Sequence, residues 1–145
     1  MVWRWVTGVA ALLLGLQTAV SVAGDKRPAL SWEALGKVSG VMQQGRYVPQ
    51  FPKDLTALDK KEVKLEGFMM PLGMGVQQKH FLLTAVPSSC GFCLPGGAEQ
   101  IVEVQAKTPV KYVLDPIVVA GRFVLVYDEG GGLLYRLTDA IAVEK

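Results

Sequence analysis

Two of the β-forming runs in this chain contain an interior glycine, which restricts the kind of sheet that they can build. Between residues 63 and 70, apolar side chains recur at every second position, and Gly67 occupies one of these positions. A longer β-rich run, Ile117–Tyr127, is interrupted by Gly121. Because an interior glycine lets a strand bend sharply at the corner of a barrel, these two positions indicate a small barrel.

Three further runs complete the expected sheet. His80–Ala85 and Ile101–Ala106 are strand-like and are bounded by proline or glycine clusters. Leu133–Leu137 is expected to form a hairpin with the Ile117–Tyr127 run, with a glycine loop between them. The pattern predicts a mainly β fold, namely a small five-stranded barrel similar to the OB fold. A small β-sandwich is the alternative, since periodicity alone does not distinguish it from a partly open barrel.

The residues before the barrel are less regular. Ser31 is a suitable N-cap for a short helix over residues 31–35, and the glycines that follow disfavour its continuation. Residues 47–52 must be extended, because each residue before a proline avoids the helical region. We therefore expect an N-terminal helical and extended arm with a linker over residues 24–61, followed by a barrel domain over residues 62–145.

The N-terminus has the layout of a signal peptide. Arg4 provides a positive start, and residues 6–16 form an almost unbroken apolar run, shorter than the ~20 residues that a spanning helix needs. The small-x-small sequence Ser21-Val22-Ala23 predicts cleavage after Ala23, so that residues 1–23 are a signal peptide and the mature protein is periplasmic. An uncleaved anchor is the alternative.

The charge balance argues against several partners. The chain has 15 lysine and arginine residues against 13 aspartate and glutamate residues. Arg4 is the only charged residue of the expected signal peptide, so 14 basic residues would face 13 acidic ones in the mature chain. This composition gives no electrostatic sign of a nucleic-acid partner or of a polybasic membrane patch. We expect a mature domain that does not span the membrane.

Cys90-Gly91-Phe92-Cys93 is the segment with the most distinctive chemistry. Its thiols allow three interpretations: a redox-active pair, a tight structural disulfide, or half of a metal site. The residues that follow, Leu94-Pro95-Gly96-Gly97, do not continue as the helix whose N-terminus activates a redox thiol. A structural disulfide suits an oxidising compartment, and a Cys-x-x-Cys turn suits zinc or cuprous copper.

A metal site needs more ligands than two cysteines. His80, the only histidine in the chain, lies at the start of the strand that leads into the cysteine segment, and it is the candidate third ligand. Met69, Met70 and Met74 precede that strand and could complete a soft site for copper. The ordinary alternatives are a surface histidine and core methionines.

Hydrolytic chemistry has little support in the sequence. The chain has no Gly-x-Ser-x-Gly motif, and its single histidine would have to be the general base in any catalytic triad. We therefore expect no catalytic residues and no enzymatic activity, with redox activity of the cysteine pair as the main alternative.

Several segments together resemble a known family. They are Val63–Leu72, which contains Gly-Phe-x-x-Pro-Leu, Cys90–Pro95, which contains Cys-x-x-Cys-x-Pro, and the order of the strands that follow. In these features the chain resembles the exported bacterial proteins called domain of unknown function thirty-two ninety-nine, although Lys60-Lys61 and Gly96-Gly97 depart from the family pattern. The resemblance implies an exported OB-like domain without an established activity. It also implies an association with transporter components, some of them linked to zinc supply.

These observations predict an exported periplasmic accessory protein. We expect it to bind a metal ion, zinc before cuprous copper, or a membrane transporter partner, through the end of the barrel that carries Cys90 and Cys93. His80 is the further candidate ligand. A thiol–disulfide exchange protein and a disulfide-stapled interaction module without metal are the alternatives.

Overall fold

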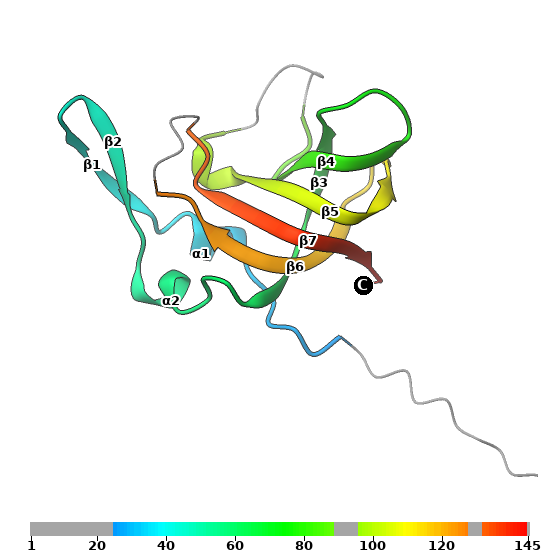
Figure 1. Cartoon of the computed structure of the whole chain (residues 1–145), viewed down its shortest axis with the longest axis horizontal. Helices are drawn as coiled ribbons and strands as arrows, with labels where there is room; N and C mark the ends of the chain where they lie inside the picture. The colour runs from blue at the N-terminus through cyan, green and yellow to red at the C-terminus, as the bar shows by residue number, and fades with distance from the viewer. Residues whose placement is uncertain (1–24, 89–95, 128–131, 145) are drawn as a thin grey trace, which may run out of the picture.

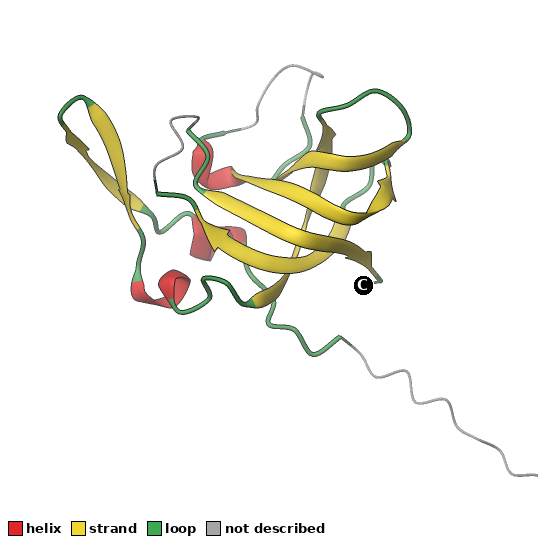
Figure 2. Cartoon of the chain, in the orientation of Figure 1, coloured by secondary structure: helices red, strands yellow, loops and turns green. Residues whose placement is uncertain are grey.

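The computed structural model describes residues 25–88, 96–127 and 132–144. Strands predominate in these residues, and the helices are short (Figures 1 and 2). In chain order the elements are α1 (Trp32–Leu35), β1 (Ser39–Gln43), β2 (Arg46–Gln50), α2 (Lys53–Thr56), β3 (Glu62–Pro71), β4 (Gln77–Thr84), the 3₁₀ helix η1 (Ala98–Gln100), β5 (Ile101–Lys111), β6 (Ile117–Leu125) and β7 (Tyr135–Val143).

In the described part of the chain, β3 to β7 close into a barrel in the order β3-β4-β5-β7-β6. Neighbouring strands are antiparallel except β5 and β7, which run parallel. A closed five-stranded barrel whose third and fifth strands are the parallel pair has the topology of the OB fold. The expected OB-like barrel is therefore confirmed, and the alternative of a sandwich is excluded.

The two interior glycines lie where the backbone of a neighbouring strand comes very close. A Cβ atom on Gly67 would lie 2.8 Å from the carbonyl oxygen of Thr84, and one on Gly121 would lie 2.8 Å from that of Thr138. At Gly121 the register between β6 and β7 also shifts, as it does at a bulge. Both glycines thus allow a close strand approach, and a side chain at either position would be crowded.

Two strands continue well past their predicted ends. The predicted strand over residues 101–106 continues in β5 to Lys111, after a register shift against β4. The predicted strand over residues 133–137 starts at Tyr135 and continues to Val143. Asp139 in β7 has a φ of 52°, which interrupts the alternation of side chains on which a sequence-based assignment depends.

One core serves the barrel and the segment before it. All five barrel strands contribute buried apolar side chains, and Leu30, Leu35 and Leu55 of the preceding segment join them. Tyr135 is fully buried in this core, where its ring stacks on Phe123 and its hydroxyl donates a hydrogen bond of 2.6 Å to the Leu35 carbonyl. The N-terminal arm thus completes the core of the barrel.

The predicted short helix is present as α1. Ser31 caps it, because its side-chain oxygen accepts a hydrogen bond of 3.1 Å from the Ala34 amide. The indole Nε1 of Trp32 donates a bond of 2.7 Å to the Glu66 carbonyl on β3. These contacts fix α1 against the barrel.

The hairpin of β1 and β2 was not predicted from the sequence. Its two-residue turn consists of Gln44 and Gly45, whose φ values of 50° and 78° match the turn type that suits the twist of a hairpin. The hairpin projects from the barrel at the upper left of Figure 1. Val41, Met42 and Tyr47 expose apolar surface on it.

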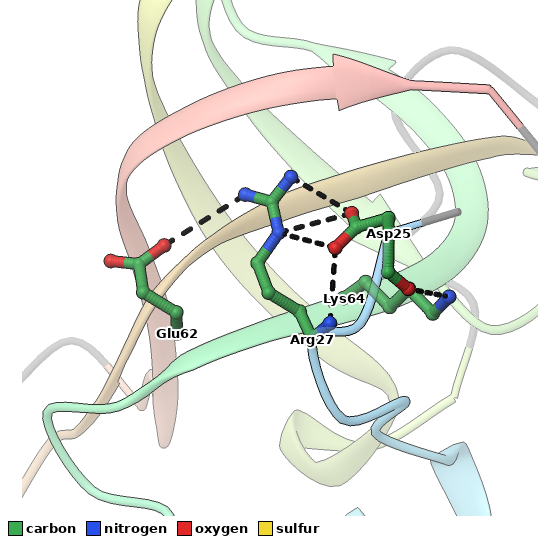
Figure 3. A network of polar contacts seen from close by, with 4 residues as sticks. All are labelled: Asp25, Arg27, Glu62 and Lys64. Carbon is green, nitrogen blue, oxygen red and sulfur yellow. Dashed lines mark hydrogen bonds and ion pairs between the residues drawn. The ribbon is translucent and has the colours of Figure 1, made fainter. Parts of the chain in front are cut away.

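A polar network ties the start of the described chain to β3 (Figure 3). Arg27 forms an ion pair with Asp25 at 2.8 Å and a longer one with Glu62 at 3.9 Å. Lys64 donates a bond of 3.1 Å to the backbone carbonyl of Asp25. The hydrogen bonds from Arg27 lower the pKa of Asp25. The arm therefore follows β3 before it reaches α1.

Candidate functional site

His80, the ligand predicted from the sequence, lies on the outer surface of the barrel. On β4, Phe81 and Leu83 are fully buried in the core, so His80 and Leu82 face the other way. The side chain of His80 is 55% exposed. A ligand can therefore reach the imidazole from solvent.

His80 belongs to a cluster that links three neighbouring strands. Glu103 on β5 lies between β4 and β7, and its side chain is only 10% exposed. One carboxylate oxygen lies 2.7 Å from Nε2 of His80, and the other accepts a hydrogen bond from Nε of Arg136 on β7. We call these three residues the His–Glu–Arg cluster.

Glu103 is ionised in this cluster. Burial by itself would raise the pKa of the Glu103 carboxyl, but the hydrogen bonds and charges of Arg136 and His80 outweigh burial and lower that pKa below its ordinary value of 4.5. The ionised carboxylate accepts from both neighbours, so the cluster holds the His80 ring in one orientation.

This arrangement can prepare a histidine for proton transfer or for metal ligation. If Nε2 of His80 donates its hydrogen to Glu103, Nδ1 carries the lone pair that a metal or a proton takes up. The described residues contain no group of three or more histidine, cysteine, aspartate or glutamate side chains that could hold a metal ion. A complete metal site would need ligands from elsewhere.

The predicted ligands Cys90 and Cys93 lie outside the described residues. The segment that contains them connects β4 to η1, and the Ala85 amide donates a hydrogen bond of 3.2 Å to the Gln100 carbonyl where the two ends of this segment meet. The segment therefore leaves and re-enters the barrel at the same end.

The three methionines considered as copper ligands are not gathered into one site. Met69 is buried in the core, Met70 faces the other side of β3, and Met74 is completely exposed in the connection between β3 and β4. Of the three methionines, only Met69 is a core residue, which was the alternative to a copper ligand.

A groove lies between the hairpin and the barrel, at the end where the cysteine segment begins and ends. Its volume is about 840 Å³. The hairpin contributes Arg46, Tyr47 and Pro49, η1 contributes Ala98, and the connection from β6 to β7 contributes Val126, Tyr127, Gly132, Leu133 and Leu134. A second hollow, about 710 Å³, lies beside it on the hairpin. His80 does not line either.

Sequence reasoning missed Glu103, Arg136 and the groove. Glu103 stands in an alternating strand, where a glutamate at an outward position is ordinary. It is 23 residues from His80 and 33 from Arg136, so only the strand register brings the three together. The hairpin had a local signal, the Gln44-Gly45 pair, which is weaker than the usual Asn-Gly or Asp-Gly.

The closed barrel with this strand order defines an OB-fold protein, and this one carries a His–Glu–Arg cluster on its outer surface. The family model described as "Protein of unknown function (DUF3299)" matches residues 19–137, and the chain belongs to this family.

One solved structure is similar over most of its length. It is the crystal structure of a DUF3299 family protein, PA4066, from Pseudomonas aeruginosa PAO1, with a TM-score of 0.57 and 22% sequence identity. The match covers 83% of this chain and 99% of the other, and it concerns the fold. No curated protein matches the chain. Among the described residues, no helix has the length and apolar character to cross a membrane.

Proposed function

We propose that this protein is an exported periplasmic accessory protein that binds zinc through His80, Cys90 and Cys93. The observation that carries the proposal is the bond between His80 Nε2 and Glu103. Histidines that ligate metals commonly donate their other ring N–H to a carboxylate, which fixes the tautomer and raises ligand basicity. In this arrangement Glu103 positions His80, and Arg136 balances the charge of Glu103.

The chain between the strand and the cysteines is long enough for such a site. His80 precedes Thr84, the last residue of β4, by four positions, about 13 Å along a strand. Cys90 follows Thr84 by six positions, which span at most roughly 20 Å when fully extended and less after the bend at Ala85 and Val86. The cysteines can therefore approach His80 if their segment turns back along β4. Two thiolates and one imidazole leave a fourth position open, which suits exchangeable binding.

Titration of the reduced exported protein with zinc tests the proposal. We expect one zinc ion per chain, with binding lost or at least roughly tenfold weaker in Cys90→Ser, Cys93→Ser and His80→Ala. Oxidised protein should bind none, because only thiolates ligate the metal. Glu103→Gln should weaken binding by roughly 10–100-fold, as expected for a residue that positions a ligand. Glu99→Gln, an acidic residue of η1 outside the cluster, is the matched control.

If reduced wild-type protein takes up neither zinc nor cuprous ion at micromolar concentration, the metal proposal fails. The midpoint potential of the cysteine pair then separates the other two functions. A structural disulfide should have a potential below about −300 mV, and an exchange protein a higher one.

The groove supports a second function, the binding of a membrane transporter partner. It joins exposed tyrosines, Tyr47 and Tyr127, to a cationic side chain, Arg46, and aromatic and arginine side chains are enriched at protein interfaces. A photo-crosslinking side chain at position 47 should capture an integral membrane protein in intact cells. The same side chain at position 66, on β3, is the control. Capture that is equal at both positions would contradict partner binding in the groove.

A further inference from the structure

The end of the barrel opposite the hairpin exposes apolar side chains on two adjacent connections. The β3–β4 connection, residues 72–76, lies at the upper right of Figure 1, far from the hairpin. It meets the β5–β6 connection where the Tyr112 amide donates a hydrogen bond of 2.8 Å to the Val76 carbonyl. Four side chains, which we call the apolar tip, are exposed here: Met74 at 100%, Leu114 at 80%, Val76 at 66% and Leu72 at 51%.

One buried side chain pairs backbone groups of the β3–β4 connection from within. Nε2 of Gln78 donates to the carbonyl oxygens of Gly73 at 3.1 Å and Gly75 at 2.7 Å, and the Gly73 amide donates to Oε1 of Gln78 at 3.3 Å. Gln78 is itself almost completely buried. Gln78 therefore pairs three backbone groups of the connection from the interior, while four apolar side chains of the tip are exposed. In water this arrangement exposes apolar surface, and in an apolar medium it leaves fewer polar groups unpaired.

Basic side chains stand behind the apolar tip. Lys79 on β4 and Lys107 and Lys111 on β5 are exposed, and Lys111 is paired in register with Gln77 at the start of β4. The charged residue of the two connections is acidic, Asp115. The composition of the whole chain gave no sign of a basic patch, because the lysines come together only through the pairing of β4 and β5. Lysines at this position attract an anionic surface.

We propose that the apolar tip inserts into the interfacial region of an anionic phospholipid bilayer. The choice of a lipid bilayer rests on three features together. Single side chains project instead of lining a groove, Gln78 pairs backbone groups of Gly73 and Gly75 from within, and exposed lysines lie where they can meet lipid phosphates. Amphipathic surfaces that bind in this way bury their apolar groups roughly 5–10 Å deep. The bilayer would then lie at the end of the barrel opposite the groove, which would stay accessible to a partner. This inference is independent of zinc binding.

Flotation of the exported protein with lipid vesicles tests the inference. The wild type should bind vesicles that contain phosphatidylglycerol and should bind pure phosphatidylcholine vesicles much less. The Met74→Ser, Leu114→Ser double variant should have an affinity for the anionic vesicles that is lower by about tenfold or more, because it removes the two most exposed apolar groups. The triple variant Lys79→Gln, Lys107→Gln, Lys111→Gln should lose the preference for anionic lipid and its sensitivity to salt.

The matched control changes exposed apolar residues at the other end of the molecule. Val41→Ser, Met42→Ser on the hairpin should bind vesicles as the wild type does. All proteins must have the same N-terminus by mass spectrometry, since the apolar run of residues 6–16 would itself bind lipid if it were retained. Absence of wild-type binding, or equal loss in the tip and hairpin variants, would overturn the inference. A photo-crosslinking side chain at position 74 that captures protein and no lipid would overturn it as well.

Discussion

The barrel and the segment before it are stabilised in different ways. The barrel, β3 to β7, is a set of paired strands that closes on itself, with glycines at two positions where neighbouring strands come close. The preceding segment, residues 25–61, has one projecting hairpin and two short helices, and it is attached through Leu30, Leu35 and Leu55 in the shared core and through a few specific polar contacts with the barrel. The difference teaches that a repeated pattern specifies the barrel, whereas individual long-range contacts place the arm.

Substitution of the interior glycines should have the largest effect on the barrel. In Gly121→Val the new side chain would collide with the Thr138 carbonyl and with Ala140, whose Cα lies 3.0 Å from a Cβ at this position. We expect the free energy of unfolding to fall by roughly 1–3 kcal/mol, as for overpacked interiors, and Gly67→Val should lower it by a similar amount. Urea unfolding measures the effect.

The control for this prediction is Gly36→Ala, at the end of α1. Its φ is −67° and a Cβ there would meet its nearest atoms at 3.5 Å, an ordinary contact. The alanine should therefore be neutral or slightly stabilising. Unchanged stability in both valine variants would show that the strands do not approach as closely as described.

Removal of the Tyr135 hydroxyl, which joins the barrel to the arm, should have the second-largest effect on stability. Tyr135→Phe removes the hydroxyl that donates to the Leu35 carbonyl and leaves that carbonyl buried without this partner. We expect a loss of about 1–2 kcal/mol in the free energy of unfolding. Tyr127→Phe is the control, because Tyr127 is an exposed tyrosine and should show almost no change. If the two variants behave alike, the Tyr135 hydroxyl does not hold the arm.

The two parts also differ in how far the sequence predicts them. The alternation around Gly67 and the cluster of β-forming residues around Gly121 are local patterns, so the five barrel strands and their closure were predicted. The hairpin was missed, because exposed strands lack an apolar face and Gln44-Gly45 is a weak turn signal. His80 could be selected as the only histidine. Its partners could not, because their proximity depends on the register of β4, β5 and β7.

The His–Glu–Arg cluster should make barrel stability depend on pH. The pKa of Glu103 is lower in the folded protein, so its carboxylate stabilises the fold above the unfolded-state pKa, and this contribution disappears as the pH falls through the folded-state pKa. Glu103→Gln should cost about 1 kcal/mol at pH 7, and the difference from the wild type should narrow below pH 4.5. Urea unfolding at several pH values measures it. A difference that is independent of pH would contradict the ionised role of Glu103.

The smallest effect on stability is expected for loss of the ion pair between Asp25 and Arg27 in the arm. Asp25→Asn tests it in the same way that Glu103→Gln tests the cluster on the barrel, because each variant removes one carboxylate charge. The pKa of Asp25 is also lowered, chiefly by hydrogen bonds from Arg27, but both side chains of this pair remain partly exposed, so water and salt screen their charges. The arm would still be held by backbone bonds on both sides of Lys64, from its own amide to the Pro28 carbonyl at 3.0 Å and from the Leu30 amide to its carbonyl at 2.8 Å. The free energy of unfolding of Asp25→Asn should therefore differ from that of the wild type by much less than that of Glu103→Gln does, at every pH and salt concentration. A loss as large as that of Glu103→Gln, reduced by salt, would instead show that the ion pair places the arm.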